Sequence, residues 1–159
     1  MRILIWTSFW IFLSDQISKY LILHVLKLDA PGVSPVNVIP GFIEFRMAWN
    51  RGVNFGLFAD FDMKWVLIGV ALALTIGIFV WLWRSGTTKL GYVAGGFLIG
   101  GALGNVVDRL LYGAVADFLN VSCCGINNPY AFNIADIAIF IGAVGLAFLP
   151  ENETPKAKR

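Results

Sequence analysis

Three aspartates in the second half of the chain, Asp108, Asp117 and Asp136, have the residue type and spacing best suited to chemistry. Asp108 lies near the end of one apolar segment, Asp117 follows shortly after it, and Asp136 lies near the start of the next. If both segments are membrane helices, the three carboxyls lie at one depth near one surface. Two carboxyls a few Å apart repel each other's charge, so one stays protonated while the other ionises. Such a pair supplies an acid and a base, and a water between them can attack an amide carbonyl.

The other charged residues of the apolar segments have a structural interpretation beside the functional one. Asp15 and Lys19 are four residues apart with the acid first, which favours an ion pair on a helix. Asp108 and Arg109 form a second candidate pair. An ionisable group inside a membrane helix is costly unless it is paired or faces a polar cavity. The two aspartates further along the chain have no basic neighbour in sequence, so packing explains them less well than catalysis does.

Other catalytic chemistries have little support. His24 is the single histidine and has no Ser or Cys motif near it, so we expect it to face lipid or the membrane interface. Cys123 and Cys124 are adjacent, without the spacing of a zinc site or of an unstrained disulfide, and we assign them no role. No HExxH motif or ligand cluster occurs, so we predict neither a metal nor a cofactor. A net charge of +2 without a basic run argues against nucleic acid.

The elements that position these residues are predicted to be membrane helices. The 159 residues are 58% hydrophobic and 14% charged, and the mean hydropathy of +0.74 exceeds that of ordinary soluble domains. Four apolar segments each have about 20 residues, the length that a spanning helix requires. They are residues 3–26, 65–83, 90–111 and 130–149. The sequence therefore predicts an all-α integral membrane protein with four transmembrane helices in a single domain, residues 1–159.

The distribution of Lys and Arg predicts the orientation of this domain. Arg2, the turn at 84–89 and the tail with Lys156, Lys158 and Arg159 are basic, whereas residues 120–129 contain no basic residue. Because basic loops stay in the cytoplasm, we expect both termini to be cytoplasmic. The loops at 27–64 and 112–129 are then extracytoplasmic. The first segment carries charges and lacks a small-residue cleavage site, so we expect it to be retained rather than removed as a signal peptide.

The loop at 27–64 is predicted to form a small β-sheet on the outer surface. Apolar and polar residues partly alternate between Val36 and Trp49, among turn-forming Pro and Gly residues. An irregular loop lying on the lipid headgroups is the alternative. In the segment at 90–111, glycines recur every four residues, which lets another helix approach closely and hold nearby polar groups in place. They are Gly96, Gly100 and Gly104.

Five blocks of the sequence contain most of its polar residues within apolar surroundings: DQISK at 15–19, NRGVNFGLF at 50–58, GGALGNVVDR at 100–109, VADF at 115–118 and FNIADI at 132–137. In this order they resemble the motifs of the bacterial lipoprotein signal peptidases, also called signal peptidase II. The resemblance covers nearly the whole chain, and five blocks in order are far more specific than any one of them. It also implies an outer β-cradle, in agreement with the predicted sheet.

The resemblance implies an aspartyl peptidase of the bacterial cytoplasmic (inner) membrane. Such an enzyme removes the signal peptide from a diacylglyceryl-modified prolipoprotein and cuts just before the lipidated cysteine. The family's catalytic aspartates correspond to Asp117 and Asp136. Its supporting polar residues, which we take to orient the pair and to contact the substrate backbone, correspond to Asp15, Lys19, Asn50, Gly52, Asn105, Asp108, Arg109 and Asn133. The expected partners are prolipoprotein signal peptides and membrane phospholipids, and we expect a monomer.

One departure from the family pattern and two competing functions remain. Asn54 stands where the family usually has a small Ala, which puts the rim of the pocket in doubt. A small transporter or proton relay would also use carboxylates inside a membrane, but it needs them spread across the bilayer rather than near one face. An intramembrane protease of the presenilin type also uses two aspartates, but its GxGD motif is absent and four helices are too few.

Overall fold

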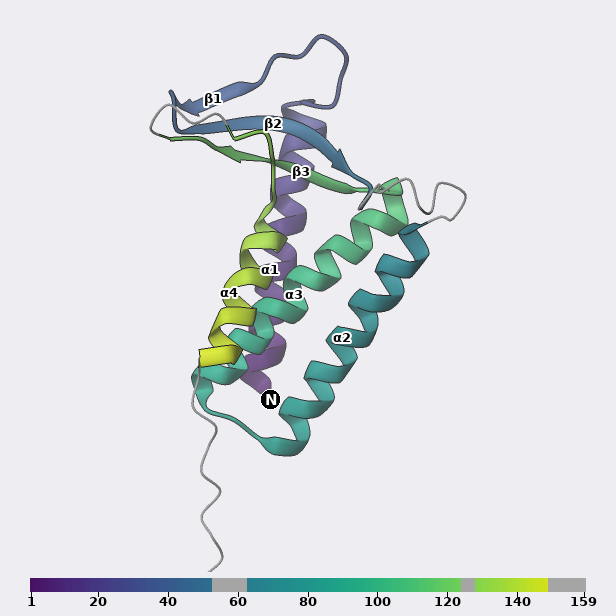
Figure 1. Ribbon diagram of the computed structural model, residues 1–159, viewed down its shortest axis with the longest axis vertical. Helices are drawn as coiled ribbons and strands as arrows, with labels where there is room; N and C mark the ends of the chain where they lie inside the picture. Colours follow the sequence, from purple (N-terminus) through teal and green to yellow (C-terminus); the bar gives the residue numbers. More distant parts are fainter. Residues whose placement is uncertain (53–62, 124–127, 149–159) are drawn as a thin grey trace, which may run out of the picture.

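The computed structural model describes residues 1–52, 63–123 and 128–148. Its helices are α1 (Arg2–Tyr20), which continues into a π-helical turn (Leu21–Val25), α2 (Met63–Ser85), α3 (Lys89–Tyr112) and α4 (Ile134–Phe148). Its strands are β1 (Val36–Ile39), β2 (Ile43–Asn50) and β3 (Val115–Val121). The helices lie side by side and the sheet covers one end of them, opposite the N-terminus (Figure 1). We call this the sheet end of the bundle.

Helix α3 is the centre of the bundle and packs against α1, α2 and α4. Gly100 permits close packing against α1, because a Cβ at this position would lie 2.5 Å from the carbonyl oxygen of Ser8. The helix ends where Gly113 adopts a left-handed conformation (φ 77°) and donates its N–H to the carbonyl of Arg109. The chain then turns directly into β3.

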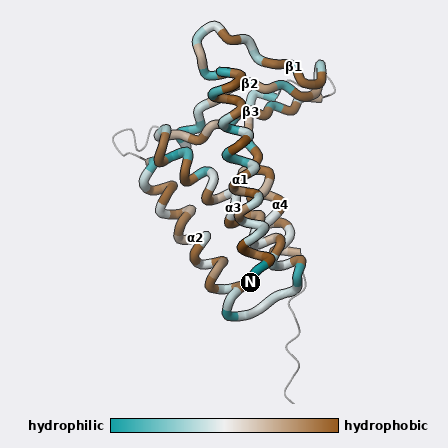
Figure 2. The backbone as a smooth tube through the Cα atoms, turned by 180° about the vertical axis from the view of Figure 1, so that it is seen from behind, coloured by the Kyte–Doolittle hydropathy of each residue, from teal (hydrophilic) through white to brown (hydrophobic). Residues whose placement is uncertain are grey.

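The helices expose apolar side chains outward, as expected of a protein surrounded by lipid. Trp65, Leu74, Ile76 and Trp83 of α2 are all more than half exposed, and apolar residues continue along the helices (Figure 2). Among the described residues, α2 and α3 are long and apolar enough to cross a membrane, with mean hydropathies of 2.5 and 1.5. The described part of α4 is apolar but has 15 residues, and α1 contains charged groups in its second half.

The sheet is antiparallel with the order β1-β2-β3. The sequence placed the sheet in the loop at 27–64 alone, whereas its third strand comes from the loop at 112–129. The alternation of apolar and polar residues could not identify this third strand, because β3 is buried along nearly its whole length and its burial does not alternate. Phe118 of β3 packs with Ile22 and Leu28, which attaches the sheet to the end of α1.

Helix α4 begins at Ile134, four residues later than the predicted segment at 130–149. The residue Phe132 is extended and exchanges backbone hydrogen bonds with Leu119 of β3, so the apolar residues before the helix belong to the sheet. Hydrophobicity alone does not distinguish these two environments.

Candidate active site

Asp117 lies on β3 with its side chain at the sheet end of the bundle. It is opposite Ala48 in the register with β2, two residues from Asn50. The carboxyl is 3% exposed. Its Oδ1 accepts a hydrogen bond from Asn133 Nδ2 at 2.7 Å, and its Oδ2 accepts one from Asn50 Nδ2 at 3.0 Å.

Asp136 lies in the first turn of α4, where its local sequence holds it in place. Asn133 Oδ1 accepts the backbone N–H of Asp136 at 2.9 Å, and Asp136 Oδ2 accepts the backbone N–H of Asn133 at 3.2 Å. This reciprocal pair resembles a capping box with Asn and Asp in its two positions. The remaining oxygen, Oδ1, accepts a hydrogen bond from Asn105 Nδ2 of α3 at 2.9 Å.

Asn133 joins the two carboxyls. It is fully buried, and its amide group contacts Asp117 at 2.7 Å and Asn105 Oδ1 at 3.2 Å while its own backbone binds Asp136. Two aspartates that are 19 residues apart in sequence are therefore held around one asparagine side chain. Burial, and secondarily the charge of Asp136, raises the pKa of Asp117 to about 6.

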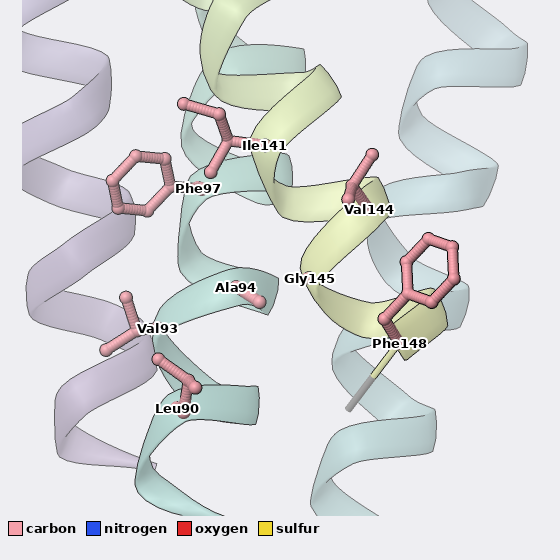
Figure 3. A pocket seen from close by; sticks show the side chains of 8 residues that line it. All are labelled: Leu90, Val93, Ala94, Phe97, Ile141, Val144, Gly145 and Phe148. Carbon is pink, nitrogen blue, oxygen red and sulfur yellow. The ribbon is translucent and has the colours of Figure 1, made fainter. Parts of the chain in front are cut away.

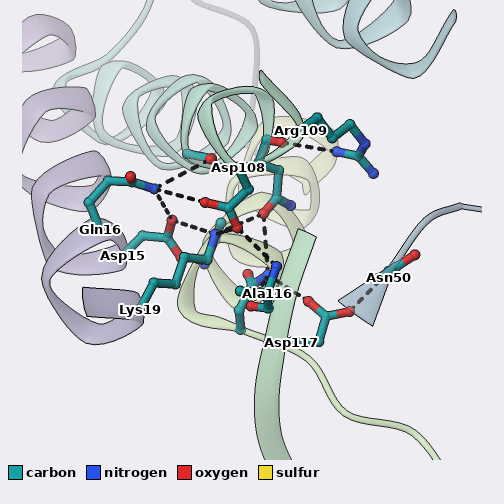
Figure 4. A network of polar contacts seen from close by, with 12 residues as sticks. Asp15, Gln16, Lys19, Asn50, Asp108, Arg109, Ala116 and Asp117 are labelled. Atoms are coloured by element: carbon teal, nitrogen blue, oxygen red, sulfur yellow. Dashed lines mark hydrogen bonds and ion pairs between the residues drawn. The ribbon is translucent and has the colours of Figure 1, made fainter. Parts of the chain in front are cut away.

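A second group of charges lies behind this pair and links α1 to α3 (Figure 4). Lys19 Nζ lies 2.7 Å from Asp15 Oδ2 and 2.8 Å from Asp108 Oδ2. All three side chains are buried, with 3%, 0% and 1% exposure respectively. The expected pair of Asp108 with Arg109 is wrong, because adjacent residues on a helix point in different directions. Asp108 pairs instead with Lys19.

The remaining predicted site residues lie at the rim. Asn50 is exposed, and its Oδ1 accepts the backbone N–H of Gly52 at 2.9 Å, where Gly52 has a φ of 93°. Arg109 is half-buried, donates to the carbonyl of Asn105 at 3.2 Å, and extends away from the charged group (Figure 4). Asn54 and Cys124 lie outside the described residues.

Sequence reasoning missed two residues that support the site. Gln16, within the DQISK block, donates through Nε2 to Asp15 Oδ2 at 3.1 Å and to Asp108 Oδ1 at 3.3 Å. Asn120 of β3 is buried and donates to the carbonyls of Asn128 and Tyr130 at 2.8 and 2.6 Å, which fixes the chain leading to Asn133. The sequence signal that could have identified Asn120 is a polar residue between two apolar ones, Leu119 and Val121.

An apolar cavity of about 310 Å³ lies between α3 and α4 (Figure 3). Its residues come from the first turns of α3 and the last turns of α4, at the end of the bundle opposite the sheet. Its lining carries no ionisable side chain. It is formed by Leu90, Val93, Ala94, Phe97, Ile141, Val144, Gly145 and Phe148. The cavity therefore offers no group for acid–base chemistry, and the polar cluster at the sheet end is the candidate active site.

A helical membrane protein with two carboxyls held together at one end of its bundle has the features of an aspartyl peptidase. Residues 7–149 match the family model described as "Signal peptidase (SPase) II", and the chain belongs to this family. The lipoprotein signal peptidase of Methylorubrum extorquens is 45% identical over 145 residues, covering 90% of this chain and 82% of that protein. The lipoprotein signal peptidase of Caulobacter vibrioides is 42% identical over 142 residues, covering 86% and 81%.

Solved structures show the same fold. A bacterial membrane enzyme determined by the in meso method at 1.9 Å resolution superimposes with a TM-score of 0.76 at 27% identity, covering 91% of this chain and 89% of that one. A second, at 2.3 Å resolution, has a TM-score of 0.74 at 28% identity and covers 98% and 93%. The likeness includes both the bundle and the sheet, since nearly the whole chain is matched.

Proposed function

We propose that Asp117 and Asp136 are the catalytic carboxyls with which this signal peptidase removes signal peptides from prolipoproteins. The observation that carries the proposal is their joint attachment to Asn133, and burial raises the pKa of Asp117 to about 6. One carboxylate takes a proton from a water as the water oxygen attacks the scissile carbonyl carbon. The other, protonated, carboxyl donates its proton toward the departing amine. The products are the signal peptide with a new carboxylate and the lipoprotein with a new amino terminus.

The distribution of charge supports a peptidase over a proton relay. Asp15, Lys19 and Asp108 lie behind the two catalytic carboxyls at the same end of the bundle and contact the backbone next to them. A relay requires titratable groups at successive depths. The far half of α3, which includes the cavity lining at Leu90 and Phe97, has an apolar surface toward α4 instead.

The substrate is a precursor whose cysteine carries a diacylglyceryl group. An extended backbone at membrane depth needs polar partners, and exposed Asn50 and half-buried Arg109 stand beside the carboxyls to provide them. The acyl chains stay in the bilayer and contribute about 0.8 kcal/mol per buried CH₂ toward holding the cysteine at this depth. We infer four transmembrane helices with both termini in the cytoplasm, so that the sheet end and the active site lie at the extracytoplasmic face. We expect the enzyme to act as a monomer.

The test is cleavage of a purified lipidated precursor by Asp117→Asn and Asp136→Asn. Each variant should lose at least about a thousandfold in rate, because the range for acid–base catalysis is roughly 10²–10⁴ and both roles depend on the pair. The matched control is Asp29→Asn, since Asp29 is exposed in the first loop and should be dispensable. Substantial cleavage by either site variant would contradict the catalytic assignment.

The same precursor without its diacylglyceryl group tests the choice of substrate. The wild-type enzyme should cleave it far more slowly, because the bilayer no longer positions the cysteine. Equal initial rates on the two precursors would show that the lipid does not position the scissile bond.

A further inference from the structure

Two buried carboxylates outside the catalytic pair bind the backbone next to it. Asp108 Oδ2 accepts the N–H of Ala116 at 3.0 Å, and Asp15 Oδ1 accepts the N–H of Ala135 at 3.0 Å. Ala116 immediately precedes Asp117, and Ala135 immediately precedes Asp136. Each carboxylate therefore fixes the backbone one residue before a catalytic aspartate. Both alanines are fully buried, so water does not compete for these amides.

Two side chains of α1, those of Lys19 and Gln16, bridge the carboxylates of Asp15 and Asp108. Lys19 Nζ contacts Asp15 at 2.7 Å and Asp108 at 2.8 Å. Gln16, on the preceding turn, donates to both at 3.1 and 3.3 Å. One continuous series of polar contacts thus runs from the backbone at Ala116 to the backbone at Ala135.

Lys19 also determines how an amide faces the catalytic pair. An ammonium has three N–H donors, and the third acceptor near Lys19 is Asn105 Oδ1 at 3.2 Å. The same oxygen accepts from Asn133. With its oxygen engaged on this side, Asn105 must present its NH₂ group to Asp136, as observed at 2.9 Å.

From this geometry we infer that Gln16, beside Lys19 whose supporting role the resemblance already implies, is a positioning residue that sets the separation and orientation of the two catalytic carboxyls without touching the substrate. Lys19 is 3% exposed and its three donors are all engaged, which leaves none for a substrate. Gln16 contacts both carboxylates that bind the amides and the carbonyl of Gly104. The inference rests on the proposed function, because it assigns a purpose to the spacing of that same pair.

Gln16→Met provides the main test, because it removes the hydrogen bonds that Gln16 donates to Asp15, Asp108 and the carbonyl of Gly104 without changing the buried charge. We expect kcat to fall about tenfold with KM within about twofold of the wild-type value, since misplacement of reacting groups by about 1 Å can cost ~10² in rate. The two limbs of the pH–rate profile should also move, because they depend on the separation of the carboxyls. Lys19→Met should lower kcat further, by about a hundredfold, and lower the yield of folded protein because two buried carboxylates lose their cation.

Ser18→Ala is the matched control on the same helix. Ser18 Oγ donates to the backbone carbonyl of Asp15 at 2.7 Å and has no contact with the two carboxylates, so its loss should leave kcat and the pH profile unchanged. Folded protein is quantified by size-exclusion chromatography before each assay, and the Asp117→Asn and Asp136→Asn variants are assayed in parallel.

The outcomes separate this inference from the proposed function. If the two aspartate variants retain activity, the proposed catalytic pair is wrong and the positioning role falls with it. If they are inactive but Gln16→Met has the kcat and pH profile of the wild-type enzyme, the pair stands and the positioning role is refuted. A raised KM with unchanged kcat would also refute it, by showing that Gln16 contacts the substrate instead.

Discussion

The raised pKa of Asp117 makes a quantitative prediction about the stability of the folded protein. Burial and the nearby charge of Asp136 raise this pKa to about 6, from an ordinary value of 3.8. The folded protein therefore binds this proton more tightly than the unfolded chain does. The stability that this contributes is fully present below pH 3.8 and is lost as the pH rises through 6.

The magnitude follows from the two pKa values. Their difference, at 1.36 kcal/mol per pKa unit, corresponds to about 3 kcal/mol over the whole titration. Most of the unfolded chains are already deprotonated at pH 5, and about nine-tenths of the folded molecules are still protonated at Asp117. Between pH 5 and pH 8 the wild-type protein should therefore lose about 1.4 kcal/mol of stability through this group. Asp117→Asn does not titrate, so its change over the same interval should be smaller by that amount.

The assay is unfolding by SDS in mixed micelles at pH 5 and pH 8, with the free energy of unfolding compared between the wild-type protein and Asp117→Asn. Comparing changes with pH cancels the constant effect of replacing a carboxyl by an amide. Asp136→Asn should retain part of the pH dependence, displaced to lower pH, because one of the two causes of the raised pKa is gone. Asp29→Asn should behave as the wild-type protein. Identical changes in the wild-type protein and Asp117→Asn would refute the reasoning.

Two further predictions concern packing and topology. Gly100→Ala should destabilise the protein by about 1–3 kcal/mol in the same unfolding assay, because its Cβ would meet the backbone of Ser8. Gly77→Ala is the control and should have little effect, because a Cβ there has no neighbour within 4 Å. Equal effects of the two substitutions would contradict the close packing of α1 and α3. Reporter fusions at Gly86 and after the C-terminus should give cytoplasmic signals and a fusion at Asp29 an external one; a cytoplasmic signal at Asp29 would place the active site on the wrong face.

The surroundings of Asp136 could be predicted from the sequence because its partner Asn133 lies one helical turn away. Asn133 and Asp136 are three residues apart at the start of an apolar segment, so a helix start with a capping pair could be expected from spacing alone. The ion pair of Asp15 with Lys19 follows in the same way from its four-residue spacing. In each case the partners lie within one turn of a helix.

The parts that could not be predicted depend on contacts between distant segments. Nothing in the spacing of residues indicates that Lys19 also binds Asp108, 89 residues further along the chain. The pairing of β3 with β2 was also missed, because β3 is buried along nearly its whole length and lacks the alternation that identifies a half-buried strand, so its residues were assigned to the loop at 112–129. Gln16 went unassigned because a neutral amide in an apolar helix suggests no partner until the two carboxylates beside it are placed.

Neutral amide groups contact the two catalytic carboxyls directly, whereas Lys19 does not, and this arrangement suits acid–base catalysis. Each of the four carboxyl oxygens accepts one hydrogen bond, and every donor is an asparagine side chain or a backbone amide. A carboxylate oxygen has two acceptor positions, so each keeps one for a water or the substrate. Neutral donors orient a carboxyl with a smaller effect on its pKa than a cation in direct contact would have. Lys19 stays one contact behind the pair and acts through Asn105 and the two amide-binding carboxylates. A lysine placed directly on Asp117 would keep it ionised and remove the acid, whereas the observed arrangement holds the geometry and leaves the proton free to move.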